Sequence, residues 1–276
     1  LFFTLGTGES VLIRHDDSRT FAAGWQSSKS SFQNAKVGDE REVGGVKLRW
    51  CPPGRFVMGS PSSEPEHRPD EAQVEVRLTK GFWMGKYEVT QGQWKRLVGE
   101  FPQPQPAGEG DEFPVVWVSH VEAEAFCQKL TALGHQSGEL PKDWEFRLPT
   151  EAQWEYACRA GTTTPYSSGM EISQEQVNFG GNRSRTVPVK SLPANAWGLY
   201  EMHGNVWEWC ADDLRTYDAA PQQDPEGPAD GPQRALRGGS WFFDAWCARS
   251  AYRGGHDPGL RYHFLGFRLC LRSRAR

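Results

Sequence analysis

Long hydrophobic runs are missing from this chain of 276 residues. A helix that crosses a membrane needs about 18 or more consecutive apolar residues, and no window of the sequence comes close. We therefore expect no membrane span. Clusters of basic residues are missing as well, and the net charge is -4. Because nucleic-acid binding depends on concentrated positive charge, we expect no nucleic-acid partner.

Paired metal-binding and redox motifs are also missing. None of the six cysteines forms a CxxC motif, and none of the seven histidines forms an HxxxH pair. This pattern favours buried, reduced thiols, with one or two disulfides in an exported protein as the alternative. A cytoplasmic location is favoured on the same ground. Export or surface display stays open, because the sequence begins at Leu1 and an upstream targeting segment would not be seen.

Glycine, proline and tryptophan are plentiful, with 30, 19 and 12 residues. This composition favours a loop-rich protein with short strands and aromatic anchors over a helical bundle. Residues 1–42 are polar and weakly periodic, which is typical of an N-terminal extension. Residues 43–276 are long enough for one domain with a sizeable core.

Three capping boxes predict where helices begin. Each has a hydroxyl residue followed three positions later by Gln or Glu, and they start at Thr90, Ser119 and Thr150. Alternating segments at 46–60 and 74–90 predict short strands. The rest of the chain shows no helical period after the third helix. Helices early and irregular strands late predict an α+β domain.

Several segments together resemble one known family. They are “GRFVMGS” (54–60), “KYEVTQGQW” (86–94), “RLPTEAQWEYACRAG” (147–161), “AWGLYEMHGNVWEWC” (196–210), “LRGGSW” (236–241) and “LGFRL” (265–269). The chain resembles the formylglycine-generating enzyme and sulfatase-modifying factor family over about Val43 to Leu271. The resemblance implies an elaborated C-type-lectin-like fold, loop-rich, with short strands and two to three helices. The family includes oxidases, ergothioneine-type synthases, lectin-like binders and variable proteins of diversity-generating retroelements, so the fold leaves the activity open.

The resemblance points away from the family's copper-dependent oxidases. Those enzymes hold copper with two cysteines five residues apart, just after a Gly-Gly-Ser. The matching positions here are Phe243 and Ala248, and Cys247 stands beside the second position without a partner. Because Cu(I) is held by paired soft thiolates, we expect no copper site and lean against an enzyme. A formylglycine-generating-type oxidase or related sulfatase-modifying enzyme remains the alternative.

The segment “EMHGNVWE” (201–208) resembles a structural calcium site of the family. The resemblance implies that Glu201 and Glu208 supply side chains and that Gly204 and Val206 supply backbone carbonyls. Such oxygen ligands suit Ca²⁺. The alternative is that the neighbouring tryptophans pack in the core and Glu208 is satisfied without an ion.

The last part of the chain has an unusual composition. Residues 242–265 contain no Lys, Glu, Gln or Met. Retroelement variable proteins diversify the adenines of Asn-type AAY codons, which cannot yield these four types, and carry their variable region at the C-terminus. The chain resembles such a protein most, with a variable-type region at about 241–267. The alternative is an ordinary family member with an aromatic-rich loop.

This region is rich in side chains that are typical of binding surfaces. We expect it to bind a protein or cell-surface ligand without catalysis. The expected contact residues are Phe242, Phe243, Asp244, Trp246, Tyr252, Gly254, Gly255, His256, Leu260, Tyr262, His263 and Phe264. Trp246 lies outside the codon set and would belong to the framework.

Overall fold

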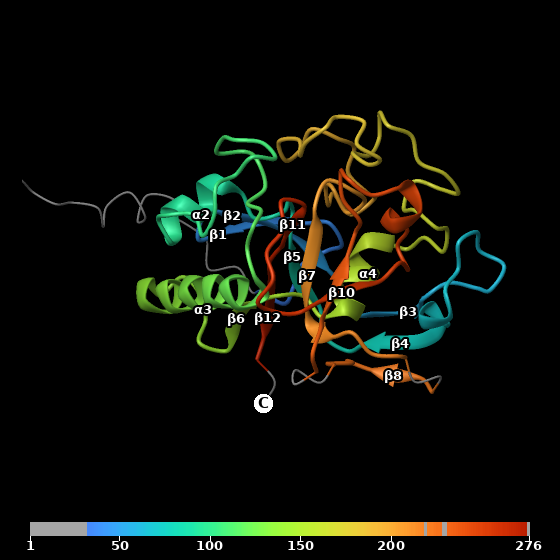
Figure 1. Ribbon diagram of the computed structural model, residues 1–276. Helices are drawn as coiled ribbons and strands as arrows, with labels where there is room; N and C mark the ends of the chain where they lie inside the picture. The colour runs from blue at the N-terminus through green and yellow to red at the C-terminus, as the bar shows by residue number, and fades with distance from the viewer. Residues whose placement is uncertain (1–31, 218–219, 228–230, 275–276) are drawn as a thin grey trace, which may run out of the picture.

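The computed structural model describes residues 32–217, 220–227 and 231–274, and Figure 1 shows the chain. Short strands in three sheets and three α-helices confirm the α+β class. The helices are α2 (Gln91–Leu97), α3 (His120–Ser137) and α4 (Glu151–Arg159), with short 3-10 turns η1 (Pro69–Glu71) and η2 (Ala245–Ala248). None of the helices in these residues is both long and apolar enough to cross a membrane.

The three predicted capping boxes are all formed. The hydroxyls of Thr90, Ser119 and Thr150 each accept a hydrogen bond from the backbone N–H three residues on, and the Gln or Glu there accepts one in return. Each box satisfies two backbone donors that the helix itself leaves unpaired. The start of each helix is therefore fixed by local sequence.

The largest sheet has five strands and carries both ends of the domain. Its order is β1 (Glu40–Val43), β2 (Val46–Cys51), β5 (Phe82–Gly85), β12 (Cys270–Ser273) and β6 (Trp144–Arg147), all antiparallel. Gly44 and Gly45 join β1 to β2 with φ of 61° and 72°. Positive φ at both turn positions suits the right-handed twist of a tight hairpin and favours glycine.

The second sheet positions the C-terminal region. Its order is β10 (Gly254–His256), β9 (Arg234–Arg237), β7 (Trp207–Asp213) and β11 (Leu265–Gly266). Strand β7 pairs antiparallel with β9 on one side and parallel with β11 on the other. The segment between β9 and β11 therefore begins and ends on opposite sides of β7 (Figure 1). A third sheet has the order β3 (Gly54–Met58), β4 (Val74–Leu78) and β8 (Gln222–Gln223).

Contacts with the domain reach back beyond the expected boundary between residues 42 and 43. Strand β1 crosses that position, and the indole N–H of Trp83 donates to the carbonyl of Phe32 at 3.0 Å. The guanidinium of Arg41 lies 4.1 Å from the centre of the Phe32 ring. The part of the expected extension that carries Phe32 therefore contacts the domain. The rest of the expected extension lies outside the described residues.

Buried ion pairs join the sheets to α4. Arg237 lies 2.9 Å from Glu151 and 2.8 Å from Glu155, and Arg253 lies 2.6 Å from Glu151. Burial alone would raise the pKa of Glu151, but the two guanidinium groups lower it to about 2. Removing one partner of such a network leaves a buried charge unpaired, which is costly.

Candidate ligand-binding surface

The predicted contact region forms a continuous group of aromatic rings around Phe264. The Tyr262 ring stacks on Phe264 with centroids 5.0 Å apart, and the Phe242 ring lies parallel to it at 6.2 Å. Phe243 and His263 meet Phe264 edge-on at 5.1 Å and 5.0 Å. Offset and edge-on pairs of this kind stabilise one arrangement of the rings beyond simple burial.

The exposure of these side chains separates a contact layer from a supporting layer. Phe242, Leu260 and Trp246 are exposed by 56%, 40% and 37%. By contrast, Tyr252 and Phe264 are buried and have little ring surface to offer a ligand. We call the exposed and half-exposed rings the aromatic surface, which consists of Phe242, Phe243, Trp246, Tyr262 and His263.

The other expected contact residues have different roles. Asp244 is exposed at the start of η2, and His256 is half-buried with its ring 5.1 Å from Tyr262. Gly254 and Gly255 lie in β10 and pair with β9. A side chain at Gly255 would come within 2.5 Å of Leu214. The second glycine therefore allows β10 to pack closely against Leu214, which directly follows β7.

Backbone contacts from a distant loop hold the start of the region in place. The N–H of Gly180 donates to the carbonyl of Phe243 at 2.8 Å, and the N–H of Gly181 donates to that of Trp241 at 2.7 Å. The buried His203 contacts the end of η2, because its Nδ1 lies 2.7 Å from the carbonyl oxygen of Ala248. These contacts fix the backbone that carries the first rings of the region, and they thereby position those rings.

Each arginine of the region is held by a carboxylate. Arg249 pairs with Glu64 and Glu71 at 2.7 and 2.8 Å, Arg253 pairs with Glu151, and Arg261 pairs with Glu122 at 2.8 Å. Asp244 and Asp257 are exposed, and the pKa values of His256 and His263 are lowered by burial. The surface therefore presents aromatic rings and carboxylates, with its cations already paired.

Two residues of the site come from outside the expected region. The N–H of Trp117 donates to the carbonyl of Tyr262 at 2.9 Å, and its ring lies 5.9 Å from His263. Trp117 has a φ of 57°, a conformation that large side chains seldom adopt. Arg68 donates to the hydroxyl of Tyr252 at 2.8 Å. No local pattern marks either residue, because both contacts join segments far apart in the chain.

The thiol of Cys247 is placed in the interior. It is 2% exposed, and burial raises its pKa to about 11. Only the thiolate is a good nucleophile or copper ligand, so this environment disfavours both roles. Phe243 packs edge-on against Trp207 at 5.9 Å, and Ala248 is buried. The two positions that match the cysteines of the oxidases thus serve packing.

The expected calcium ligands meet a protein cation. Glu208 is buried, and Nε and Nη2 of Arg268 donate to its two oxygens, each at 2.6 Å. The indole N–H of Trp154 donates to the same carboxylate at 2.7 Å. Nη2 of Arg268 also donates to the backbone carbonyl of Glu201 at 3.2 Å. The guanidinium thus lies between two of the expected ligand residues.

The carboxylate of Glu201 is also occupied by donors. It accepts hydrogen bonds from the backbone N–H groups of Lys190 at 3.1 Å and Leu192 at 3.3 Å. Burial nevertheless raises its pKa to about 7. In this arrangement the residues do not fit a calcium ion, and the calcium site stays a prediction from resemblance.

Comparison with known proteins places the chain among its relatives. Hercynine oxygenase of Mycolicibacterium smegmatis is 30% identical over 258 residues, which are 79% of this chain and 59% of that protein. Serine/threonine-protein kinase pkn1 of Chlamydia caviae is 46% identical over 127 residues, 44% of this chain and 20% of the kinase. The chain thus spans less than two thirds of the length of both relatives.

One solved structure is similar to this chain over nearly the whole length of the solved protein. Treponema denticola variable protein 1 superimposes with a TM-score of 0.72 and 29% identity, covering 84% of this chain and 98% of that one. This similarity confirms the elaborated C-type-lectin-like fold. The domain family described as “Sulfatase-modifying factor enzyme 1-like domain” matches residues 35–273. The protein therefore belongs to the family of formylglycine-generating enzymes and sulfatase-modifying factors.

Proposed function

We propose that this protein binds a protein or another cell-surface ligand through the aromatic surface. The observation that carries the proposal is the contrast between exposed rings and a rigid base. Phe242 is more than half exposed, while Phe264 beneath it is buried and contacts three other rings of the region. Rigid aromatic side chains give large contact area at low entropic cost.

The charges around the aromatic surface favour a particular partner. Asp244 and Asp257 are exposed, whereas the three arginines of the region are paired with glutamates. Aromatic faces attract cations, and nearby carboxylates strengthen that attraction. We therefore favour a partner segment that presents Lys or Arg together with apolar groups.

The similarity to a variable protein supports a diversified version of this function. The region from about 241 to 267 lacks Lys, Glu, Gln and Met over residues 242–265, and its anchoring residues are buried while its ring tips are exposed. Surface tips on a fixed base can be exchanged without unfolding. A near-copy of these codons beside a reverse-transcriptase gene, differing almost only at adenines, would support diversification. The absence of any such near-copy from the genome would contradict diversification.

Photo-crosslinking tests the binding function directly. A benzophenone amino acid placed at Phe242 should crosslink to a discrete partner on intact cells. The same group at Met170, which is 63% exposed and outside the surface, is the matched control. Crosslinking at Phe242 should fall when Trp246→Ser is added. Equal crosslinking from both sites would contradict the proposal.

An oxidase is the second candidate, because the family and hercynine oxygenase both point to oxygen chemistry. Purified protein incubated with copper, oxygen and a Cys-x-Pro-x-Arg peptide should leave the cysteine unchanged, because Phe243 and Ala248 cannot ligate copper. Conversion of that cysteine to formylglycine, lost on heat treatment of the protein, would support the oxidase instead.

A further inference from the structure

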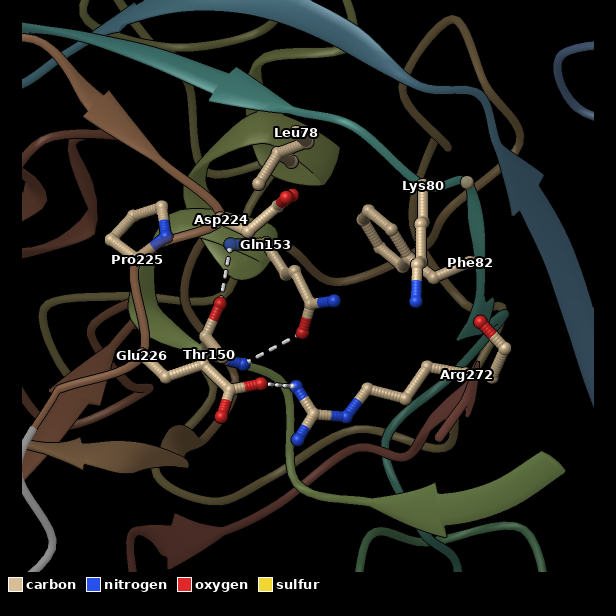
Figure 2. Close-up of a pocket in the computed structure, with 11 residues that line it drawn as sticks. Leu78, Lys80, Phe82, Thr150, Gln153, Asp224, Pro225, Glu226 and Arg272 are labelled. Atoms are coloured by element: carbon tan, nitrogen blue, oxygen red, sulfur yellow. Dashed lines mark hydrogen bonds and ion pairs between the residues drawn. The ribbon is translucent and has the colours of Figure 1, made fainter. Parts of the chain in front are cut away.

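A separate hollow of about 150 Å³ opens at the start of α4, and Figure 2 shows the side chains around it. It shares no lining residue with the aromatic surface. The walls come from the end of β4, the start of β5, the N-terminus of α4, the stretch after β8 and the end of β12. They are formed by Leu78, Lys80, Gly81, Phe82, Thr150, Gln153, Asp224, Pro225, Glu226, Arg272 and Ser273.

Lys80 brings an unused positive charge to this hollow. Its side chain runs along the wall beside Phe82, and its ammonium group points into the space in Figure 2. No hydrogen bond or ion pair joins the ammonium group to another residue in the described ranges. An ammonium group has three donors to offer an incoming anion.

The amide of Gln153 adds a second donor whose direction is fixed. Its Oε1 accepts a hydrogen bond from the backbone N–H of Thr150 at 3.0 Å, as the capping box requires. The thiol of Cys270 donates to the same oxygen at 3.7 Å. Because these two donors hold the oxygen, the NH₂ end of the amide must face the other way. Figure 2 shows it pointing into the hollow.

The acidic side chains on the walls are already engaged. Both oxygens of Asp224 accept hydrogen bonds from Thr79, one from its N–H at 2.7 Å and one from its hydroxyl at 2.5 Å. Glu226 forms an ion pair with Arg272 at 2.5 Å, and its side chain is 61% exposed at the rim. An exposed ion pair is weak, so an anion that enters can compete for Arg272.

The remaining walls are apolar. Pro225, which is half-buried, and the methylene stem of the exposed Lys80 supply the accessible apolar surface, whereas Leu78 and Phe82 line the hollow but are only 4% and 1% exposed. An inorganic anion would leave these surfaces in contact with water. A carboxylate on a short hydrocarbon body would place its charge at Lys80 and Gln153 and cover the apolar walls.

We propose that this hollow binds a small organic carboxylate with a short apolar body. The carboxylate accepts hydrogen bonds from the ammonium group of Lys80 and the amide NH₂ of Gln153, with Arg272 as a third donor at the rim. The hydrocarbon part lies against Pro225 and the methylene stem of Lys80. The site is independent of the aromatic surface and of any oxidase chemistry.

Titration calorimetry of the full chain with 3-methylbutanoate tests the site. The matched neutral probe, 3-methylbutanamide, should bind at least about tenfold more weakly, because charge-assisted hydrogen bonds to the carboxylate are lost. Lys80→Gln should weaken binding of the carboxylate by about tenfold as well. Glu226→Gln should strengthen it, because the competing carboxylate is removed.

Gln153→Glu is the sharpest variant. Glutamate at this position still completes the capping box, so the helix start is kept. The variant turns a carboxylate oxygen toward the hollow in place of the amide NH₂, and binding should be lost while the melting temperature stays the same. Equal binding of the amide probe, or unchanged binding in both Lys80→Gln and Gln153→Glu, would overturn the proposal. So would failure of the carboxylate to bind at all.

Discussion

Arg268 donates to both carboxylate oxygens of Glu208 at 2.6 Å, and both residues are fully buried. Glu208 lies near the start of β7, whereas Arg268 lies between β11 and β12. The guanidinium donates further to the backbone carbonyls of Gly85 and Tyr200. This pair therefore ties the “GFR” segment after β11 to the start of β7 and to β5.

Breaking this pair should destabilise the fold strongly. Glu208→Gln leaves the guanidinium of Arg268 buried without its counter-charge, and Arg268→Met does the reverse. Each should lower the free energy of unfolding by about 3–5 kcal/mol, measured by urea denaturation. The double variant should cost less than the sum of the two, because the residues are in direct contact. Strict additivity would show that the two residues act separately.

Removal of divalent ions should leave stability unchanged. The family resemblance implies a calcium ion at Glu201 and Glu208, whereas the structure supplies the counter-charge from Arg268. We therefore expect the same melting temperature in EDTA and in excess calcium. A fall in EDTA that calcium reverses, but that magnesium does not, would establish the ion and overturn this expectation.

The buried histidine beneath η2 should make stability depend on pH. Burial lowers the pKa of His203 from its ordinary value of 6.5 to about 4. The unfolded chain thus takes up the proton first as the pH falls. The stabilising contribution is complete above pH 6.5 and is lost between pH 6.5 and about 4. The loss is on the order of 3 kcal/mol.

A difference measurement isolates this histidine. The pKa of Asp212 is raised to about 6 and that of Glu201 to about 7, in both cases mainly by burial, and these groups change stability in the opposite direction. The free energy of unfolding should therefore be compared between the natural protein and His203→Asn at each pH. The gap between them should narrow from pH 7 to pH 4. A constant gap would contradict the assignment.

The contact layer and the supporting layer should respond differently to substitution. Phe242→Ser and Leu260→Ser change exposed side chains and should shift the free energy of unfolding by no more than about 0.5 kcal/mol. Phe264→Ala removes a buried ring and should cost about 3–5 kcal/mol. Thermal denaturation distinguishes the two groups. Equal costs would show that the exposed rings belong to the core.

The native thiols should be unreactive. All six cysteines are buried and unpaired, and burial raises the pKa of Cys247 to about 11 and that of Cys158 to about 12. Ellman's reagent at pH 8 should therefore titrate no thiol in the folded protein and six in urea. Rapid labelling of one cysteine under native conditions, mapped to Cys247, would reopen a reactive role for that residue.

Local signals in the sequence predicted the helix starts, because a capping box is closed by residues three positions apart. The strand segments were also marked by alternation. The sequence did not indicate which strands pair, because β5 pairs with both β2 and β12, and β12 lies far along the chain. The composition of the last region predicted a contact surface, and Phe242 and Trp246 within it are exposed.

The composition could not predict that Tyr252 and Phe264 are buried. A segment without a hydrophobic period does not distinguish aromatic residues that face the core from those that face the solvent. The contact of Trp117 with Tyr262 and the pairing of Glu208 with Arg268 are equally long-range. The hollow beside Gln153 needed the side-chain positions themselves, because its donors come from three distant segments.

The placement of β7 between β9 and β11 brings the two ends of the C-terminal region close together. Both ends of residues 238–264 are anchored one strand away from β7, so they lie about 10 Å apart, two strand spacings. Within this region Arg249, Arg253 and Phe264 are buried and must be kept, whereas the exposed stretch around Leu260 can change in length with little extra loop-closure entropy. The scaffold thus accepts new recognition residues at its exposed positions while its buried anchors stay constant.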